Sequence, residues 1–144
     1  MIDDMKIEIA TGDYIKDKDK AVKVIGYSVE DVNGNQSTLE YIVPNIIIND
    51  EVLECCGFVK NGEKYQINYS DSNLSYIILV SKSQQSYRCD IYNNKSHKQI
   101  NTKNDIMVLS VLQDFIRQNT QGGELDIDFP RLTKEVAKIK PKIE

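Results

Sequence analysis

Hydrophobic and polar residues alternate along several short segments of this chain. The segments with the clearest alternation are residues 5–9, 21–29, 37–43, 64–69 and 86–92. Because successive side chains of a β-strand point to opposite faces of a sheet, this period of two predicts half-buried strands. Residues 74–81 are apolar almost without interruption from Tyr76 to Val80, so we expect this strand to be central in its sheet and buried on both faces.

Turn residues separate these segments and indicate antiparallel connections. Asn33-Gly34 is the strongest hairpin signal, because both residues accept a positive φ angle. Pro44 ends the segment that follows, because proline has no N–H to donate to a strand ladder. We therefore expect residues 5–43 to form a small antiparallel sheet of about four strands, curled into a barrel-like meander.

Two segments, residues 50–56 and 103–119, have the spacing of helices instead. The shorter lies between Asn49, a good N-cap residue, and Gly57, which suits a left-handed C-terminal stop. The longer carries apolar side chains every three or four positions, and Thr102 or the residue before it could cap it. Its polar side, which we expect to face solvent, carries Ser110, Gln113, Asp114 and Arg117.

The residues after these helices predict a strand and a tail. Residues 125–129 alternate again and predict a short C-terminal strand, which Pro130 ends. Residues 131–144 contain five basic and two acidic residues and predict a basic tail. A weak amphipathic helix and a frayed chain end would both be consistent with this composition.

Taken together, these elements predict the α+β class, with antiparallel sheets and one short and one long helix. We expect a single domain over residues 1–130, in which a β subdomain (1–44) precedes a helix-sheet-helix part (45–130). A hydrophobic content of 40% in 144 residues is sufficient for one core. The net charge of −4 does not favour nucleic acid or an anionic membrane as a partner of the whole molecule. The apolar runs are too short to span a bilayer and the first residues are acidic, so we expect a cytoplasmic protein without a membrane partner.

Three stretches of the chain match motifs found together elsewhere. Residues 12–15, Gly12-Asp13-Tyr14-Ile15, are similar to a GNxV segment, residues 43–58 to a PIPLTEEWLLKFGFEK stretch, and residues 112–125 to an LQNLYFALTGEEL helix and strand. In this order the motifs resemble those of uncharacterised small proteins of Bacteroidetes phages and mobile elements. The chain departs from that pattern, because it has no tryptophan and carries an additional basic tail. The resemblance implies a phage or mobile-element origin and the cytoplasm of a bacterial host, and it implies no catalytic residue.

Residues able to perform chemistry are few and scattered. The single histidine, His97, lies in a polar turn, and we expect it to be solvated. Cys55, Cys56 and Cys89 lack the spacing of a zinc site, so we expect neither a metal site nor a cofactor. We expect Cys89 to be a small buried side chain, and one of Cys55 and Cys56 to be buried and the other half-exposed. Acidic side chains that share one face of the predicted last strand could bind a metal but are more typical of a solvent-facing side; they are Glu124, Asp126 and Asp128.

Two kinds of residue are candidates for binding. Strand-borne tyrosines can stack on bases but are more often core-edge residues, and lysines of the tail can contact phosphates. The candidate binding residues are Tyr14, Tyr27, Tyr41, Arg131, Lys134, Lys138 and Lys140. The favoured hypothesis is a non-enzymatic accessory protein that binds a host component, with a host protein as partner and an anti-defence inhibitor as one form. Nucleotide or nucleic-acid binding is the alternative, and a metal-dependent hydrolase is the second alternative.

Overall fold

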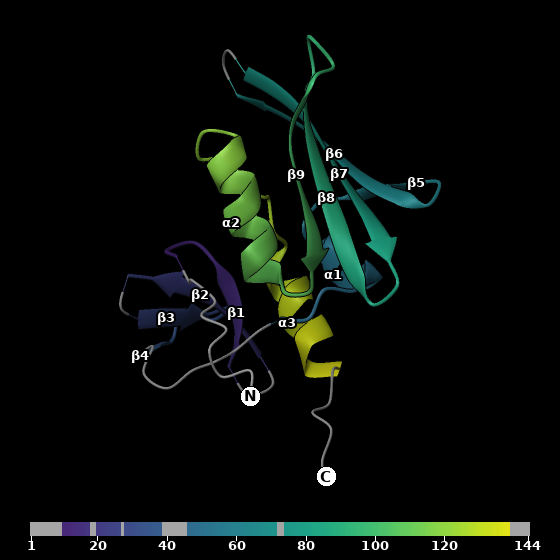
Figure 1. Cartoon of the computed structure of the whole chain (residues 1–144). Helices are drawn as coiled ribbons and strands as arrows, with labels where there is room; N and C mark the ends of the chain where they lie inside the picture. Colours follow the sequence, from purple (N-terminus) through teal and green to yellow (C-terminus); the bar gives the residue numbers. More distant parts are fainter. Residues whose placement is uncertain (1–9, 18–19, 27, 39–45, 72–73, 139–144) are drawn as a thin grey trace, which may run out of the picture.

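The computed structural model describes residues 10–17, 20–26, 28–38, 46–71 and 74–138, which form two antiparallel sheets and three helices (Figure 1). The strands of the first sheet are β1 (Tyr14–Asp17), β2 (Lys20–Ile25), β3 (Ser28–Asp31) and β4 (Gln36–Thr38). Those of the second sheet are β5 (Val59–Asn61), β6 (Lys64–Asp71), β7 (Leu74–Ser83), β8 (Ser86–Asn93) and β9 (Gln99–Ile106). The helices are α1 (Asp50–Cys55), α2 (Leu109–Asn119) and α3 (Phe129–Lys138). The predicted α+β class is confirmed.

The first sheet is a meander in the order β1-β2-β3-β4. The hairpin predicted at Asn33-Gly34 joins β3 to β4, with Gly34 at φ +85°. The single strand predicted over residues 21–29 is wrong, because the chain turns at Gly26, where φ is +81°, and forms β2 and β3 instead. Within the described residues β1 pairs only with β2 and β4 only with β3, so these strands form an open sheet and do not close a barrel. Predicted strand residues 5–9 and 39–43 lie outside the described residues.

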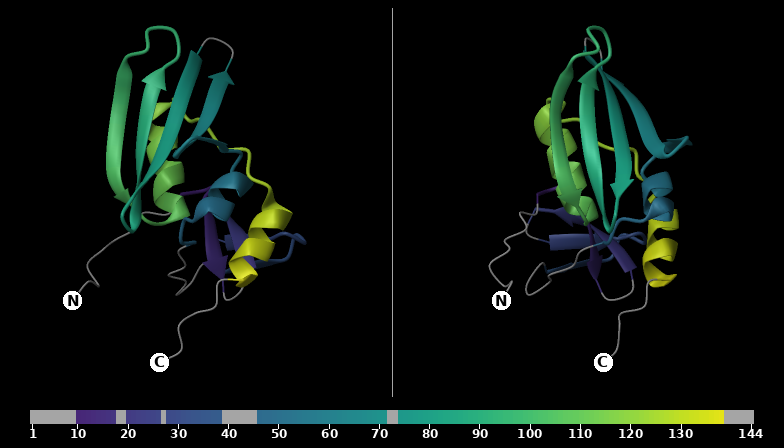
Figure 2. Two further views of the ribbon diagram at one scale, coloured as in Figure 1. Left: turned by 90° about the vertical axis from the view of Figure 1, so that its right-hand side faces the viewer. Right: turned by 45° about the vertical axis from the view of Figure 1, so that its right-hand side comes forward.

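The second sheet has the order β5-β6-β7-β8-β9, with β7 at its centre as predicted. Burial alternates along β7: Ile78 and Val80 are buried, whereas Ile77 and Leu79 are half-buried. The expectation that this strand is buried on both faces is therefore wrong. Figure 2 shows the physical reason, because α2 lies behind one face of the sheet and no helix of the described chain lies in front of the other.

The capping signals of the shorter helix are confirmed. Asn49 Oδ1 accepts a hydrogen bond from the Val52 N–H at 2.8 Å, as an N-cap does, and Gly57 follows the helix with φ +90°. The longer helix begins at Leu109, six residues later than predicted, because the preceding residues pair with β8 as strand β9. Thr102 therefore lies in β9, and no side chain caps α2.

The strand predicted over residues 125–129 is wrong. The burial of residues 124–128 alternates, but within the described chain they have no regular secondary structure and belong to neither sheet. Asp128 instead starts α3: its Oδ1 accepts from the Arg131 N–H at 3.2 Å and its carbonyl from the Leu132 N–H at 2.8 Å. Pro130 fits the first turn, where no N–H partner is needed. The expected tail is therefore an amphipathic helix up to Lys138, with Leu132 and Val136 fully buried.

One large hydrophobic core connects most of these elements. It contains apolar residues from all three helices, the inner face of the second sheet, and Tyr14 and Ala21 of the first sheet. A smaller cluster inside the first sheet consists of Ile15, Val22, Val24 and Val29. Among the described residues, no helix is long and apolar enough to cross a lipid bilayer.

Candidate functional site

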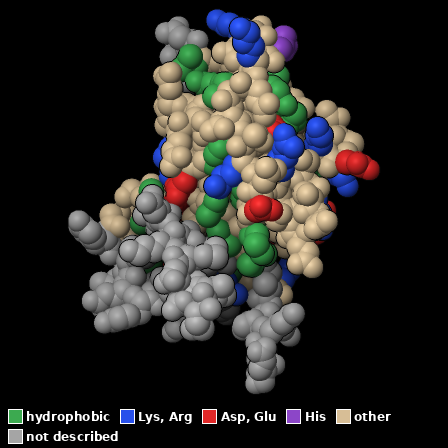
Figure 3. Space-filling view, in the orientation of Figure 1, with side chains coloured by type: hydrophobic (Ala, Val, Ile, Leu, Met, Phe, Trp, Pro, Cys, Tyr) green, Lys and Arg blue, Asp and Glu red, His purple; other side chains and the backbone are tan. Residues whose placement is uncertain are grey.

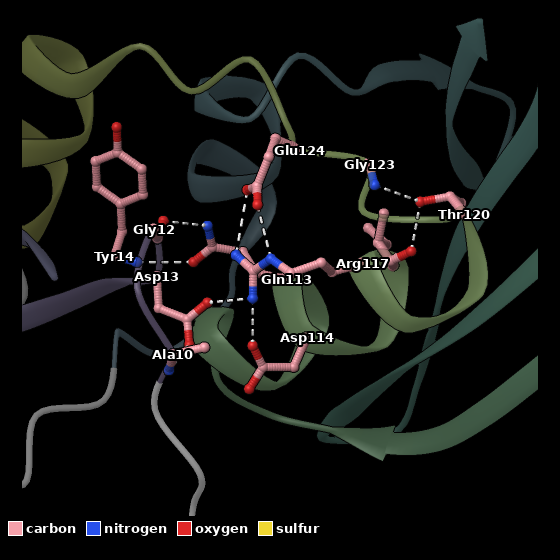
Figure 4. Close-up of polar contacts among 11 residues, drawn as sticks. Ala10, Gly12, Asp13, Tyr14, Gln113, Asp114, Arg117, Thr120, Gly123 and Glu124 are labelled. Carbon is pink, nitrogen blue, oxygen red and sulfur yellow. Dashed lines mark hydrogen bonds and ion pairs between the residues drawn. The ribbon is translucent and has the colours of Figure 1, made fainter. Parts of the chain in front are cut away.

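Arg117, in the last turn of α2, is the centre of an ion-pair network between the first sheet and the rest of the chain (Figure 4). Its Nη1 lies 3.1 Å from Asp13 Oδ1 and 2.6 Å from Asp114 Oδ1. Its Nε and Nη2 donate to the two carboxylate oxygens of Glu124, at 2.7 and 3.2 Å. Bidentate guanidinium–carboxylate pairs of this kind are the strongest and most directional ion pairs in proteins. The network, defined as Asp13, Asp114, Arg117 and Glu124, thus joins residues about a hundred positions apart.

Each acid of the network is placed by a different local structure. Asp13 comes directly before β1, and its Oδ2 accepts from the Ala10 N–H at 2.8 Å. Asp114 lies three residues before its partner on α2. The Thr120 hydroxyl donates to the Ile116 carbonyl and accepts from the Gly123 N–H at 3.1 Å, which orders the turn that delivers Glu124.

Three carboxylates surround one guanidinium, so the network carries excess negative charge. Burial raises the pKa of Asp13, against the effect of its hydrogen bond from Ala10 and of the Arg117 charge. Burial also raises the pKa of Asp114 to about 7, and the neighbouring Asp13 carboxylate adds to this effect. Near neutral pH, the two aspartates therefore retain a proton that ordinary aspartates would have lost.

Asp114→Asn should reduce the pH dependence of stability. Because the pKa of the folded form is raised from 3.8 to about 7, the folded state binds more protons than the unfolded state within this range, and stability falls as pH rises through it. Replacing the carboxyl group with an amide should remove about 1–2 kcal/mol of this decline, after allowance for solvent screening. Urea denaturation at several pH values from 4 to 8 measures the effect.

Asp126→Asn is the matched control, because Asp126 is an exposed carboxylate outside the network. This variant should keep the wild-type decline. If Asp114→Asn declines as steeply as the control, the carboxylate does not retain its proton in the folded protein.

Gln113 closes the free edge of β1. Its Oε1 accepts from the Tyr14 N–H at 2.8 Å, and its Nε2 donates to the Gly12 carbonyl at 3.1 Å. The side-chain amide thereby supplies the two hydrogen bonds that a neighbouring strand would supply. Gln113 and Ser110 are buried, so the expectation that the polar side of this helix faces solvent is wrong for both.

A groove of about 540 Å³ lies beside the network and is lined by Tyr14, Lys23, Val24 and Glu124, among others. The Tyr14 ring packs edge-on against Phe129, with 5.0 Å between the ring centres, and Lys23 Nζ lies 5.9 Å from the Tyr14 ring centre. The Glu124 carboxylate already binds Arg117. Because these polar groups are engaged within the chain, the network and groove together have the features of a joint between the two sheets.

The outer face of the second sheet has different properties. We define the outer-face patch as Ile77, Leu79, Arg88 and Tyr92. Ile77 lies opposite Tyr92 in the ladder of β7 and β8, and these two side chains and Leu79 are partly buried. The outer-face patch therefore combines aliphatic, aromatic and guanidinium groups on rigid central strands.

A buried carboxylate holds the arginine of this patch. Asp90 is buried although it lies on the outer face, and its Oδ1 accepts from Arg88 Nε at 3.1 Å, Gln99 Nε2 at 3.0 Å and Thr102 Oγ1 at 2.6 Å. One charge-assisted hydrogen bond, from Nε, links the Arg88 side chain, which is about half exposed, to this carboxylate. The bond favours one orientation of the guanidinium on the outer face.

The tyrosines predicted to bind are only partly described. Tyr14 lies at the groove, with most of its surface buried against Phe129. Burial raises its pKa, and the hydroxyl is therefore neutral at physiological pH. Tyr27, Tyr41 and Lys140 lie outside the described residues.

The structure brings three of the predicted basic residues together. Arg131, Lys134 and Lys138 are spaced three and four residues apart on α3 and all are exposed. Arg131 Nη2 is paired with Glu54 Oε1 at 3.1 Å, and Lys138 Nζ with Glu135 Oε2 at 3.1 Å. These pairs reduce the positive charge that the helix presents to an anionic partner.

The acids considered for a metal do not converge. Glu124 binds Arg117, Asp128 caps α3, and Asp126 is exposed between them. Within the described ranges, no group of three or more histidine, cysteine, aspartate or glutamate side chains could hold a metal ion.

The thiols and the histidine lie apart. Cys55, Cys56 and Cys89 are buried, so the expectation that one of the first two is half-exposed is wrong. Burial raises the pKa of all three thiols, most strongly for Cys56 and Cys89. A raised pKa disfavours the reactive thiolate, so these are features of structural cysteines. His97 lies on the surface, in the turn between β8 and β9 (Figure 3).

No family model matches this chain, and no curated protein or solved structure is significantly similar to it. Its function must therefore be inferred from the geometry of its own residues. The sequence predicted neither the network nor the hydrogen bonds of Asp90 with Arg88, Gln99 and Thr102. Their only sequence signal is polar residues at helical or strand spacing, which ordinary solvent-facing elements also have.

Proposed function

We propose that this chain is a non-enzymatic accessory protein that binds a host protein through the outer-face patch. The single observation that carries the proposal is Arg88, hydrogen-bonded to the buried Asp90 beside the partly buried Leu79 on a face that no helix of the described chain covers. Tyrosine and arginine are enriched in protein–protein interfaces and among the residues that contribute most to binding energy. An aromatic ring, a guanidinium and two aliphatic side chains together suit a protein surface as partner.

Preorganisation supports the same proposal. The patch lies on β7 and β8; β7 pairs with β6 and with β8 over eight residues each, and β8 also pairs with β9. Such strands lose little conformational entropy on binding, and Arg88 is already restrained. A buried carboxylate lowers stability unless it is hydrogen-bonded. The burial of Asp90 is consistent with a functional role for it, which is to orient Arg88.

The proposed origin and location rest on the motif resemblance alone. The chain would be encoded by a phage or mobile element and would act in the cytoplasm of a bacterial host. An anti-defence inhibitor is one form of this function, because such a protein can act by binding alone and needs no chemistry of its own.

Nucleic-acid binding through α3 is the second candidate. The observation that favours it is the shared exposed face of Arg131, Lys134 and Lys138. The ion pairs of Arg131 with Glu54 and of Lys138 with Glu135 weaken it. A phosphate backbone would have to compete with both carboxylates, whereas a protein partner needs no such exchange at the outer-face patch.

Tyr92→Ala should weaken capture of the host partner about tenfold or more, because truncating a central interface tyrosine removes a large contact area. The measurement is affinity capture from host lysate treated with nuclease, followed by titration of the captured protein against wild type and variant. Lys134→Ala is the control and should bind as wild type does. Capture that nuclease abolishes and that Lys134→Ala weakens would contradict the proposal and favour nucleic acid.

A further inference from the structure

The edge of the second sheet next to β5 is only partly covered. β5 pairs with three of the eight residues of β6, and Val59 opposite Gln66 is the last pair. Before β5 the chain turns away at Gly57, where φ is +90°, and continues back into α1. Residues 67–71 of β6 therefore have β7 on one side and no strand of the described chain on the other.

The direction of the backbone groups along this edge follows from the hairpin of β5 and β6. Asn61 and Lys64 flank a two-residue turn, so this pair is hydrogen-bonded and the N–H and C=O of Lys64 point toward β5. Alternate residues of a strand point the same way, so the main-chain groups of Asn68 and Ser70 also point to the open side. Neither has a main-chain hydrogen bond outside its own sheet in the part of the chain that is described.

A hollow of about 420 Å³ lies where β5 and β6 diverge. The residues that line it include Gly57, Val59, Lys60, Ile67 and Asn68. Val59 is 68% exposed, which is the largest exposed fraction among the large hydrophobic residues described. The hollow thus offers apolar contact directly beside the unpaired main-chain groups.

Two other strand edges in the described part of the chain, those of β1 and β9, are protected. Gln113 hydrogen-bonds the edge of β1. β9 has two irregularities in its pairing with β8 and carries Lys103 and Asp105, and bulges and charges of this kind prevent pairing with further strands. The open part of β6 has neither protection, and its outward side chains, Asn68 and Ser70, are small and uncharged.

We propose that residues 67–71 of β6 receive an extended segment of the partner protein as an added strand, with one apolar side chain in the hollow. Only a polypeptide in extended form can satisfy the alternating N–H and C=O groups of Asn68 and Ser70 together. Lys60 is part of the lining of the hollow, so the segment should carry an acidic residue near its apolar one. This inference rests on the proposed function, because it specifies how a protein partner is held.

The test uses the full chain and a fluorescent five-residue probe, acetyl-Thr-Val-Thr-Leu-Asp-amide, in a fluorescence-polarisation titration. Wild type should bind the probe saturably. A probe with the same side chains but N-methylated at alternate amides should bind about tenfold or more weakly, because it lacks the donors of a strand ladder. Equal binding of the two probes would overturn the inference.

Two variants locate the probe. Ser70→Pro removes the outward N–H of an edge position that tolerates proline and should abolish binding, whereas Ser70→Thr should retain it. Val59→Lys changes an exposed side chain of the hollow and should weaken binding about tenfold or more, and this variant remains informative if the proline variant does not fold. Binding that neither variant changes would overturn the inference.

Two further outcomes separate this inference from the proposed function. If Tyr92→Ala loses the host partner and Ser70→Pro retains it, the edge inference fails and the proposed function stands. If the probe binds as described but no host protein is captured, the edge inference stands and the proposed function fails. If wild type is a dimer that Ser70→Pro converts to a monomer, the edge pairs with a second copy and the inference is overturned.

Discussion

Replacing Arg117 with methionine should lower the free energy of unfolding by about 3–5 kcal/mol at neutral pH. The Asp13 carboxylate is fully buried, and Arg117 is the cation that compensates its charge. Methionine keeps much of the side-chain volume and removes the charge, so the loss reports on electrostatics rather than packing. The loss should be smaller near pH 5, because the pKa of Asp114 is raised to about 7 and this acid takes up a proton as the pH falls to 5, which lowers the negative charge that Arg117 has to compensate.

Urea denaturation monitored by circular dichroism at pH 5 and pH 7.5 gives the required free energies. Arg131→Met is the matched control, because Arg131 and its partner Glu54 are each nearly half exposed. Exposed ion pairs contribute little, so the control should change stability by about 0.5 kcal/mol or less. If Arg117→Met is no more destabilising than Arg131→Met, the network does not stabilise the joint between the sheets.

Leu132→Ala should cost about 2–5 kcal/mol, the range observed when a fully buried leucine is truncated. Leu132 has no exposed surface and belongs to the same core as α1 and the second sheet. If the residues after Pro130 formed an exposed tail, truncating Leu132 would not lower the stability of the protein. This variant therefore measures directly whether α3 is an integral part of the domain.

The control is Lys134→Ala, two residues further along the same helix and on its exposed side. Alanine is a good helix former, so this change should leave stability within about 0.5 kcal/mol of wild type. Both variants are compared by chemical denaturation under one set of conditions. Equal stability of the two would show that α3 does not pack in solution as the structure has it.

Arg117 and Leu132 hold the first sheet from two sides. α2 carries the network that binds Asp13, and α3 packs against β2, where the Thr133 hydroxyl donates to the Ala21 carbonyl at 3.4 Å. Tyr14 and Ala21 also belong to the large core. Loss of either anchor should therefore lower the stability of the whole domain in one cooperative transition rather than release the first sheet alone.

The candidate site was less predictable than the fold. The polar side of the long predicted helix contained Gln113 and Arg117, and nothing local distinguishes them from solvated residues. Their partners, Tyr14 and Asp13, lie about a hundred residues earlier in the chain. Only the packing of α2 against β1 brings these groups within hydrogen-bonding distance, and burial in that packing then raises the pKa values of the two aspartates.

Several elements of this protein were determined by its sequence alone, because their causes are local. Alternation specified β6 and β8, Asn33-Gly34 specified a hairpin, and Asn49 with Gly57 specified both ends of α1. Where the pattern of a segment is compatible with two kinds of secondary structure, the tertiary structure decided which one forms. Residues 103–106 have partners in β8 and became strand, whereas residues 125–129 have none in the described chain and stayed out of the sheets. Hydrogen bonds between strands depend on a neighbour from elsewhere in the chain, and no local pattern of side chains records whether that neighbour is present.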